Sequence, residues 1–272
     1  MKKFTLLDGA MGTSLQQSGK LSVGENPSKL NIESPDTVAS VHRAYLQAGS
    51  DIIITNTFAA TALPNFEEII ASGVKIAKLA AQGFNAKVAL NIGPLQNSLE
   101  PLGTNDETKA YEIFKKQVEI GVKNGADIIY IETMTDLNET KIAVTAAKEN
   151  CRLPIFCTMT FEESLRTFMG VDIPTMAETL EKAGTSAIGI NCSVGPEKMF
   201  EMASQLKQHT NLPIIIKPNA GLPTVENGEI VYNVTPEEFA NEMKRIVELG
   251  VDFIGGCCGT NPTFIAALKQ AV

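Results

Sequence analysis

The feature that most constrains the fold is an alternation, repeated eight times, between short apolar segments and longer amphipathic segments. The apolar segments do not alternate polar with apolar residues, as expected for parallel strands buried on both faces. They span residues 5–9, 51–56, 87–92, 127–132, 155–161, 187–192, 213–218 and 252–256. The amphipathic segments predict helices at residues 35–48, 65–82, 106–124, 136–149, 174–183, 196–208, 236–249 and 262–272.

Local signals mark where these helices begin and end. Ser34, Thr235 and Asn261 can each cap a helix, and each precedes a proline that suits the first helical turn. Glycine closes a helix because it adopts the left-handed conformation easily. The glycines placed to do so, each shortly before a predicted strand, are Gly49, Gly125, Gly184 and Gly250.

Eight strand–helix units in about 250 residues match the size of a closed (β/α)8 barrel. An open, doubly wound sheet uses the same unit and is the competing architecture. The repeat occupies the whole chain, and unusual residues gather at one end of the strands; both observations favour the barrel. We predict an α/β protein with a single TIM-barrel domain over residues 1–272.

Two extended runs about Asn227-Gly228 predict a tight hairpin after the seventh strand.

Charge and hydropathy limit the partners and the location. The formal net charge of -8 disfavours binding to nucleic acid and to anionic membranes. Lys2, Lys3 and a short apolar run resemble the start of a signal peptide, but Asp8 interrupts the run. No stretch approaches the roughly 18 apolar residues that a membrane-spanning helix needs. We expect a cytoplasmic protein with no nucleic-acid or membrane partner.

Polar residues end nearly every predicted strand, on the side where barrel enzymes carry their catalytic groups. The strand ends are Asp8-Gly9, Asn56-Thr57, Asn91, Glu132, residues 158–160, Asn191-Cys192, residues 217–219 and Cys257-Cys258. The glycine-rich runs match neither a dinucleotide fingerprint nor a P-loop. Nicotinamide and ATP chemistry are therefore disfavoured.

The cysteines carry the strongest chemical signal. There are five, and an odd number without a secretion signal argues against a disulfide framework. In Gly255-Gly256-Cys257-Cys258-Gly259, glycine allows the chain to leave regular strand geometry, so that both thiols can reach one ion. Cys192 ends the sixth strand, two positions round the barrel, and strands about 4.8 Å apart leave a gap that one zinc ion can bridge. Three thiolates with an open fourth position are typical of a catalytic zinc site.

Other interpretations of these cysteines stay open from the residues alone. The adjacent pair could be buried core thiols or a redox-active pair. Cys151, at a helix end, and Cys157, inside an apolar strand, are predicted to be structural.

Glu132 and Asp8 are carboxylates at the ends of their strands. Each could bind a substrate ammonium, or could instead form a salt bridge or cap a helix. His42 lies within a predicted helix and His209 follows one. We predict that both histidines lie at the surface and that neither binds the metal.

Taken together, the motifs resemble the homocysteine S-methyltransferase family, whose members share a homocysteine-binding domain. Within it, the similarity is greatest to the N-terminal homocysteine domain of cobalamin-dependent methionine synthase. The matching segments run from the first strand to the last helix: residues 7–13, residues 48–58, Gly189-Ile190-Asn191-Cys192-Ser193, Pro218-Asn219-Ala220-Gly221 and residues 255–260.

This resemblance implies a (β/α)8 barrel that binds Zn2+ through Cys192, Cys257 and Cys258. It also implies that Asp8 and Glu132 hold the amino group of homocysteine. The other substrate contacts expected from it are backbone amides for the carboxylate at Gly9, Ala10 and Met11, and Asn191 in the same motif as the first cysteine.

The implied reaction is methyl transfer to the homocysteine thiolate, giving methionine, with methylcobalamin on a separate or missing corrinoid module as the expected donor. The chain ends within about fifteen residues of Cys258. It could therefore be a fragment of a larger synthase with folate and cobalamin domains, or a stand-alone protein. The alternatives are S-methylmethionine or another small donor, a corrinoid-linked enzyme with a different small substrate, and a zinc-binding or redox protein without transfer activity.

Overall fold

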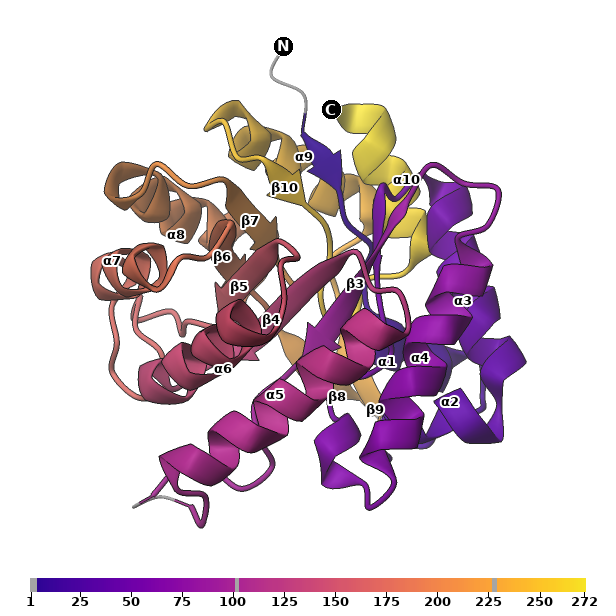
Figure 1. Cartoon of the computed structure of the whole chain (residues 1–272). Helices are drawn as coiled ribbons and strands as arrows, with labels where there is room; N and C mark the ends of the chain where they lie inside the picture. Colours follow the sequence, from indigo (N-terminus) through magenta and orange to yellow (C-terminus); the bar gives the residue numbers. More distant parts are fainter. Residues whose placement is uncertain (1–3, 101–102, 227–228) are drawn as a thin grey trace.

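A ring of eight parallel strands forms the centre of the molecule (Figure 1). The computed structural model describes residues 4–100, 103–226 and 229–272. Around the ring the strands follow the order β1-β10-β7-β6-β5-β4-β3-β2, and a parallel bridge between Leu7 and Ile52 joins the two ends. The predicted (β/α)8 barrel is therefore confirmed over the open sheet. The strands are β1 (Thr5–Leu6), β2 (Ile52–Ile54), β3 (Lys87–Ile92), β4 (Ile128–Met134), β5 (Ile155–Met159), β6 (Ala187–Asn191), β7 (Ile214–Lys217) and β10 (Phe253–Ile254).

All eight predicted helices are present and surround the strands (Figure 1). Thr235 makes the expected capping box with Glu238, and Gly49 and Gly184 close their helices at φ 107° and 90°. Among the described residues, no helix is both long and apolar enough to cross a membrane. The helices are α3 (Pro35–Ala48), α4 (Phe66–Ala80), α5 (Glu107–Lys123), α6 (Leu137–Asn150), α7 (Ile173–Ala183), α8 (Pro196–His209), α9 (Pro236–Glu248) and α10 (Pro262–Ala271).

Short elements between the first strands were not predicted. They are α1 (Met11–Gln17), α2 (Leu30–Glu33) and single 3-10 turns at Pro27–Lys29 and Ala60–Ala62. At seven residues or fewer, these segments are too short to show a clear helical period in the sequence. They lie on the carboxyl side of β1 and β2, and residues of α1 together with Pro27 line a cavity at this end of the barrel.

Side chains fill the inside of the barrel. Alternate residues of a strand point to opposite faces, so on β2 Ile52 and Ile54 point inward while Ile53 packs against the helices. Inside, the Phe156 and Phe253 rings lie 4.7 Å apart, centroid to centroid. The barrel is a packed core, so any cavity for a ligand must open at one end of it.

A two-stranded hairpin interrupts the repeat between β7 and α9. β8 (Pro223–Glu226) pairs antiparallel with β9 (Glu229–Tyr232), as the sequence predicted. The predicted Asn227-Gly228 turn lies outside the described residues. The hairpin lies toward the carboxyl ends of the barrel strands, in the lower half of Figure 1.

The prediction that His42 lies at the surface is wrong. Its side chain is completely buried in α3, whereas His209 is exposed at the end of α8. Neither ring nitrogen of His42 has a hydrogen-bond partner among the described residues. Burial therefore lowers the pKa of His42 to about 4 and keeps the ring neutral. The sequence placed it on a helix but gave no sign that this face of α3 is covered.

We expect the His42→Leu variant to resist acid better than the wild type. The unfolded chain binds a proton at His42 below about pH 6.5 and the folded protein only near pH 4, so stability is lost as the pH falls between these values. Between about pH 6.5 and pH 5 this loss amounts to about 2 kcal/mol. Urea unfolding at about pH 7 and about pH 5 measures it. An equal acid loss in wild type and variant would contradict the assignment.

Candidate metal centre and substrate pocket

The three cysteines predicted to bind metal lie together at the carboxyl end of the barrel. Cys192 follows β6, and Cys257 and Cys258 follow β10. The Sγ atoms of Cys192 and Cys258 are 3.8 Å apart, and all three Sγ atoms lie within 4.8 Å of one another. Within the described ranges, this is the one group of three or more potential metal-binding side chains.

Tight backbone packing brings the cysteine loop into place. A Cβ atom on Gly255 would lie 2.7 Å from the Asp8 carbonyl oxygen, and one on Gly256 would overlap Thr260. The sequence predicted that glycines on either side of the cysteine pair allow unusual backbone geometry. Gly259 does so at φ 81°, whereas Gly255 and Gly256 are required by close approach. Near the third thiol, Cys192 and Ser193 are also left-handed, at φ 64° and 65°.

The thiol cluster fits a tetrahedral zinc ion. Zn–S bonds of about 2.3 Å at tetrahedral angles place the sulfur atoms about 3.8 Å apart, which is the separation of the Cys192 and Cys258 sulfur atoms. A hydrogen bond to Cys192, and then burial, raise the pKa of the Cys257 thiol well above its ordinary value. Three crowded thiols of this kind ionise readily only beside a cation, and thiolate ligands select soft metals such as zinc.

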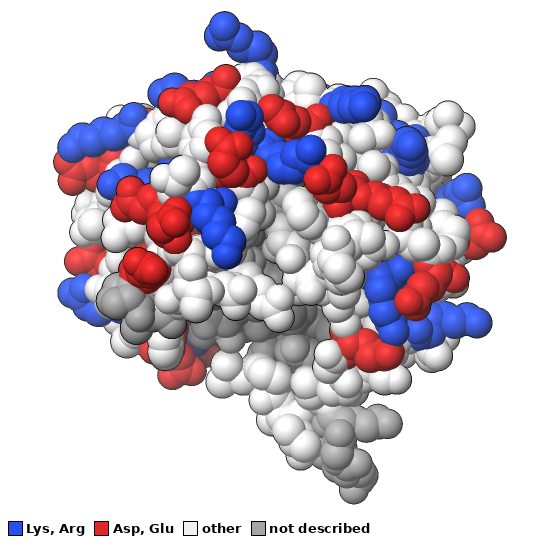
Figure 2. Space-filling model, turned by 60° about the horizontal axis from the view of Figure 1, so that its bottom comes forward, with Lys and Arg blue, Asp and Glu red and all other residues white. Residues whose placement is uncertain are grey.

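A cavity of about 670 Å³ opens beside the thiols. Its wall contains the three cysteines, the strand-end residues Asp8, Glu132 and Lys217, and the segment from Gly9 to Thr13. The mouth is apolar, with Val23, Phe58 and Ile230 exposed around it. Figure 2 shows this side of the molecule, where the charged side chains that are coloured gather mainly in the upper part of the view.

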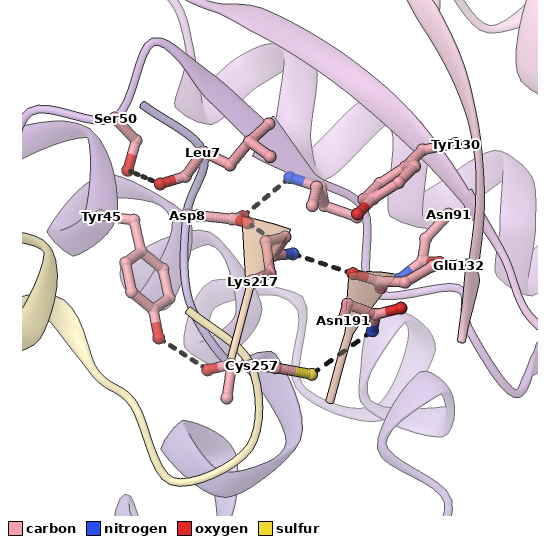
Figure 3. Close-up of polar contacts among 12 residues, drawn as sticks. Leu7, Asp8, Tyr45, Ser50, Asn91, Tyr130, Glu132, Asn191, Lys217 and Cys257 are labelled. Carbon is pink, nitrogen blue, oxygen red and sulfur yellow. Dashed lines mark hydrogen bonds and ion pairs between the residues drawn. The ribbon is translucent and has the colours of Figure 1, made fainter. Parts of the chain in front are cut away.

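A buried lysine lies between the two predicted carboxylates (Figure 3). Lys217 Nζ is 2.9 Å from Glu132 Oε1 and 3.9 Å from Asp8 Oδ1. The Asn91 side chain donates to Glu132 Oε2 at 3.0 Å, and the Ile54 amide donates to Asp8 Oδ2 at 2.8 Å. The group carries two potential negative charges and one positive charge.

Burial changes how Asp8 titrates. It raises the pKa of Asp8 to about 7, against the opposing effect of the Lys217 ammonium. Asp8 Oδ1 accepts no hydrogen bond from any described residue, and neither does the nearby Asn91 Oδ1. Buried acceptors without donors are rare in folded proteins, so these two oxygens point to a ligand with N–H groups.

Lys217 and Asn91 are the residues that the sequence did not assign to the site. Both appeared in the ring of polar strand ends, but nothing in their spacing indicated which side chains would meet. Lys217 is opposite Asn191 in the β6–β7 register, and Asn91 is opposite Tyr130 in the β3–β4 register. That register places Asn91 and Lys217 on either side of Glu132.

Of the other residues predicted to contact the substrate, some line the cavity and one does not. Gly9, Ala10 and Met11 line the cavity where β1 passes into α1, although the Ala10 amide already donates to Thr260 Oγ1 at 3.2 Å. Asn191 ends β6, is completely buried and does not line the cavity. Cys157 is buried in β5, and Cys151 is half-buried at the end of α6. Neither belongs to the thiol cluster.

Fold and site together define a (β/α)8-barrel protein with a three-thiol candidate metal centre beside a carboxylate pair. The sequence matches the homocysteine S-methyltransferase family over residues 5–272, and the chain belongs to that family. It is 30% identical to the methionine synthases of Mycobacterium leprae (strain TN) and Mycobacterium tuberculosis (strain ATCC 25618 / H37Rv). Each alignment covers 97% of this chain, which spans only 24% of the length of either relative.

Solved structures agree with this membership. The homocysteine methyltransferase MmuM from Escherichia coli, in its apo and metallated forms, matches with a TM-score of 0.79 at 25% identity, over 99% of this chain and 96% of that one. The carboxyl transferase domain of Rhizobium etli pyruvate carboxylase matches at a TM-score of 0.57 and 17% identity, which reflects the shared barrel fold alone.

Proposed function

We propose that the protein is a zinc-dependent methyltransferase that transfers a methyl group to the thiolate of homocysteine and so forms methionine. One observation carries the proposal: three clustered thiols and a carboxylate pair line the same cavity, so one small molecule with a thiol and an amino group can reach both. Family membership supports the same reaction.

Cys192, Cys257 and Cys258 would hold the zinc ion. The match of their sulfur separation to a tetrahedral site supports this assignment, and their close spacing would favour a cation over three neutral thiols. When bound, zinc lowers the pKa of an incoming thiol, so that the thiol becomes a nucleophile at neutral pH. The similar homocysteine methyltransferase MmuM from E. coli has also been solved in a metallated form.

Asp8, Glu132 and Asn91 would bind the amino group of homocysteine. The unpartnered Asp8 Oδ1 and Asn91 Oδ1 supply acceptors for an ammonium, and Glu132 adds a charge that Lys217 only partly offsets. The substrate carboxylate would lie against the backbone at Gly9, Ala10 and Met11, where the first turn of a helix leaves amides without partners inside the helix. These contacts orient the substrate sulfur toward the cysteines.

The methyl donor would be methylcobalamin held by a separate corrinoid module. The thiolate sulfur attacks the methyl carbon in line, the new S–C bond forms, and the donor leaves with the electron pair of the broken bond. The similarity to one part of two methionine synthases supports this donor, as does the apolar rim of the cavity, where Val23 and Ile230 are exposed. A small donor is the second candidate, because the matching E. coli enzyme is little longer than this barrel.

A donor panel tests the proposal. The purified, zinc-loaded chain is assayed with homocysteine and, in turn, methylcobalamin, S-methylmethionine, S-adenosylmethionine and betaine. Methionine formation from methylcobalamin is the expected result, and preference for a small donor would overturn the corrinoid assignment alone. Zinc-loaded protein that neither binds homocysteine nor transfers methyl from any donor would contradict the function itself.

The affinity for methionine is expected to fall as the pH falls below about 7. Asp8 holds the ammonium strongly only when it is ionised, because a carboxylate makes a charge-assisted hydrogen bond, and burial raises its pKa to about 7. Protonation therefore competes with binding, and affinity at about pH 5.5 should be roughly 30-fold below its value at about pH 8. Calorimetry with methionine measures this without a titrating thiol. Asp8→Asn should bind weakly with a flat profile; an unchanged acid limb in this variant would assign the proton elsewhere.

A further inference from the structure

Thr133 adopts a backbone conformation that its side chain disfavours. Its φ is 61°, in the left-handed region, which is uncommon for a β-branched residue. It lies in an irregular part of β4, where the register against β5 shifts between Ile131 and Met134. Such a bulge redirects neighbouring side chains, and the residue immediately before Thr133 is Glu132. The conformation of Thr133 therefore helps to set the direction of a carboxylate in the cavity.

The Asn191 side chain holds Thr133 in this conformation from the next strand but one. Its Oδ1 accepts from the Thr133 amide at 3.1 Å, and its Nδ2 donates to Thr133 Oγ1 at 2.7 Å. Asn191 is completely buried, whereas Thr133 is half-buried and lines the cavity. Left-handed residues that are not glycine persist where surrounding contacts determine them in this way.

The same amide group also contacts the thiol cluster. Asn191 Nδ2 lies 3.6 Å from Cys257 Sγ, within hydrogen-bond distance for sulfur (Figure 3). An amide has two N–H groups, so one can serve Thr133 Oγ1 and the other the sulfur. A hydrogen bond donated to a thiolate withdraws electron density from it, and such outer contacts tune how a ligand binds its metal.

We propose that Asn191 is a positioning residue that couples the amino-group site to the thiol cluster, instead of contacting substrate. One arm fixes Thr133 and through it Glu132; the other donates to Cys257. The two ends of the substrate would then meet groups aligned by a single buried side chain. This inference rests on the proposed function for the identity of the substrate, but the contacts themselves do not depend on it.

Three variants separate the two arms. Asn191→Ala removes both. Asn191→Asp keeps an oxygen for the Thr133 amide but loses both N–H donors. Adding Thr133→Gly to Asn191→Ala supplies a residue that adopts a positive φ without help. Each protein is loaded with cobalt(II), and the sulfur-to-cobalt charge-transfer band, methionine affinity, and KM and kcat for homocysteine are measured. Urea unfolding checks that each variant is folded.

Asn191→Ala is expected to weaken methionine binding and raise KM about tenfold, the effect of one lost buried hydrogen-bond arm. It should also shift the cobalt band. Adding Thr133→Gly should restore methionine affinity and KM to within about threefold of wild type, while the band stays shifted. Asn191→Asp should shift the band with a smaller effect on KM.

Two results would overturn the coupling. No rescue of KM by Thr133→Gly would show that Asn191 does not act through Thr133, and an unshifted cobalt band in Asn191→Ala and Asn191→Asp would show that it does not act on Cys257. Failure of the proposed function gives a different outcome, because wild-type protein would then fail to bind methionine while still showing a cobalt band that responds to Asn191.

Discussion

Replacing Cys257 with alanine is expected to abolish stoichiometric zinc binding and to reduce methyl transfer more than about 1000-fold. The three thiols are the described side chains grouped closely enough to hold the ion, so a two-thiol remnant leaves a weak site. Even changes to residues that only support a metal ligand cost about 10- to 100-fold. Zinc content by elemental analysis and turnover with homocysteine measure the two effects separately.

Cys151→Ala is the matched control for this experiment. It removes a half-buried thiol at the end of α6, outside the cluster, and should leave zinc content and turnover unchanged. Full zinc content and turnover in Cys257→Ala would refute the proposed mechanism. Loss of zinc in the control as well would point to general misfolding rather than to a ligand.

Replacing Glu132 with glutamine is expected to damage both the fold and substrate binding. Lys217 is almost fully buried and would lose its nearest counter-charge, leaving only Asp8 at 3.9 Å. Breaking a buried ion pair from one side costs about 3 kcal/mol or more. The loss of a carboxylate that faces the substrate ammonium should weaken methionine binding about 100-fold, because hydrogen bonds between charged groups are the strong ones.

A second substitution separates these effects. Lys217→Met in the Glu132→Gln background removes the stranded charge and should recover most of the stability lost, measured by urea unfolding. Methionine binding should remain weak in this double variant. 4-Mercaptobutanoate, which is homocysteine without its amino group, should bind wild type and double variant equally well. Recovery of methionine affinity together with stability would show that Glu132 acts only through the fold.

The repeat of strands and helices could be predicted from the sequence because it depends on local patterns. Buried parallel strands read as apolar runs, and the caps at Thr235 and the glycine stop at Gly184 need no information beyond a few neighbours. The cluster of Cys192 with Cys257 and Cys258 was also predicted, because strand ends of a barrel meet at one rim.

What the sequence did not predict depends on contacts between distant residues. Lys217 meets Glu132 only because of the barrel register. A lysine at the end of a predicted strand is common, so its presence alone did not indicate a buried ion pair. His42 is buried because other elements cover α3, and the left-handed Thr133 is stabilised by Asn191, 58 positions away. Pairing and burial of this kind are properties of the assembled fold and leave no local pattern.

The pairing of β1 with β10 has a consequence for how the protein matures. Thr5 is opposite Phe253, so the first strand of the barrel gains its second neighbour only when the last strand of the barrel is in place. Asp8 and the Cys257-Cys258 pair extend from these two strands and approach each other only when the ring closes. A nascent chain that has not reached Cys257 and Cys258 would thus lack two of the three thiols that we propose as zinc ligands. Metal uptake should therefore mark closure of the barrel.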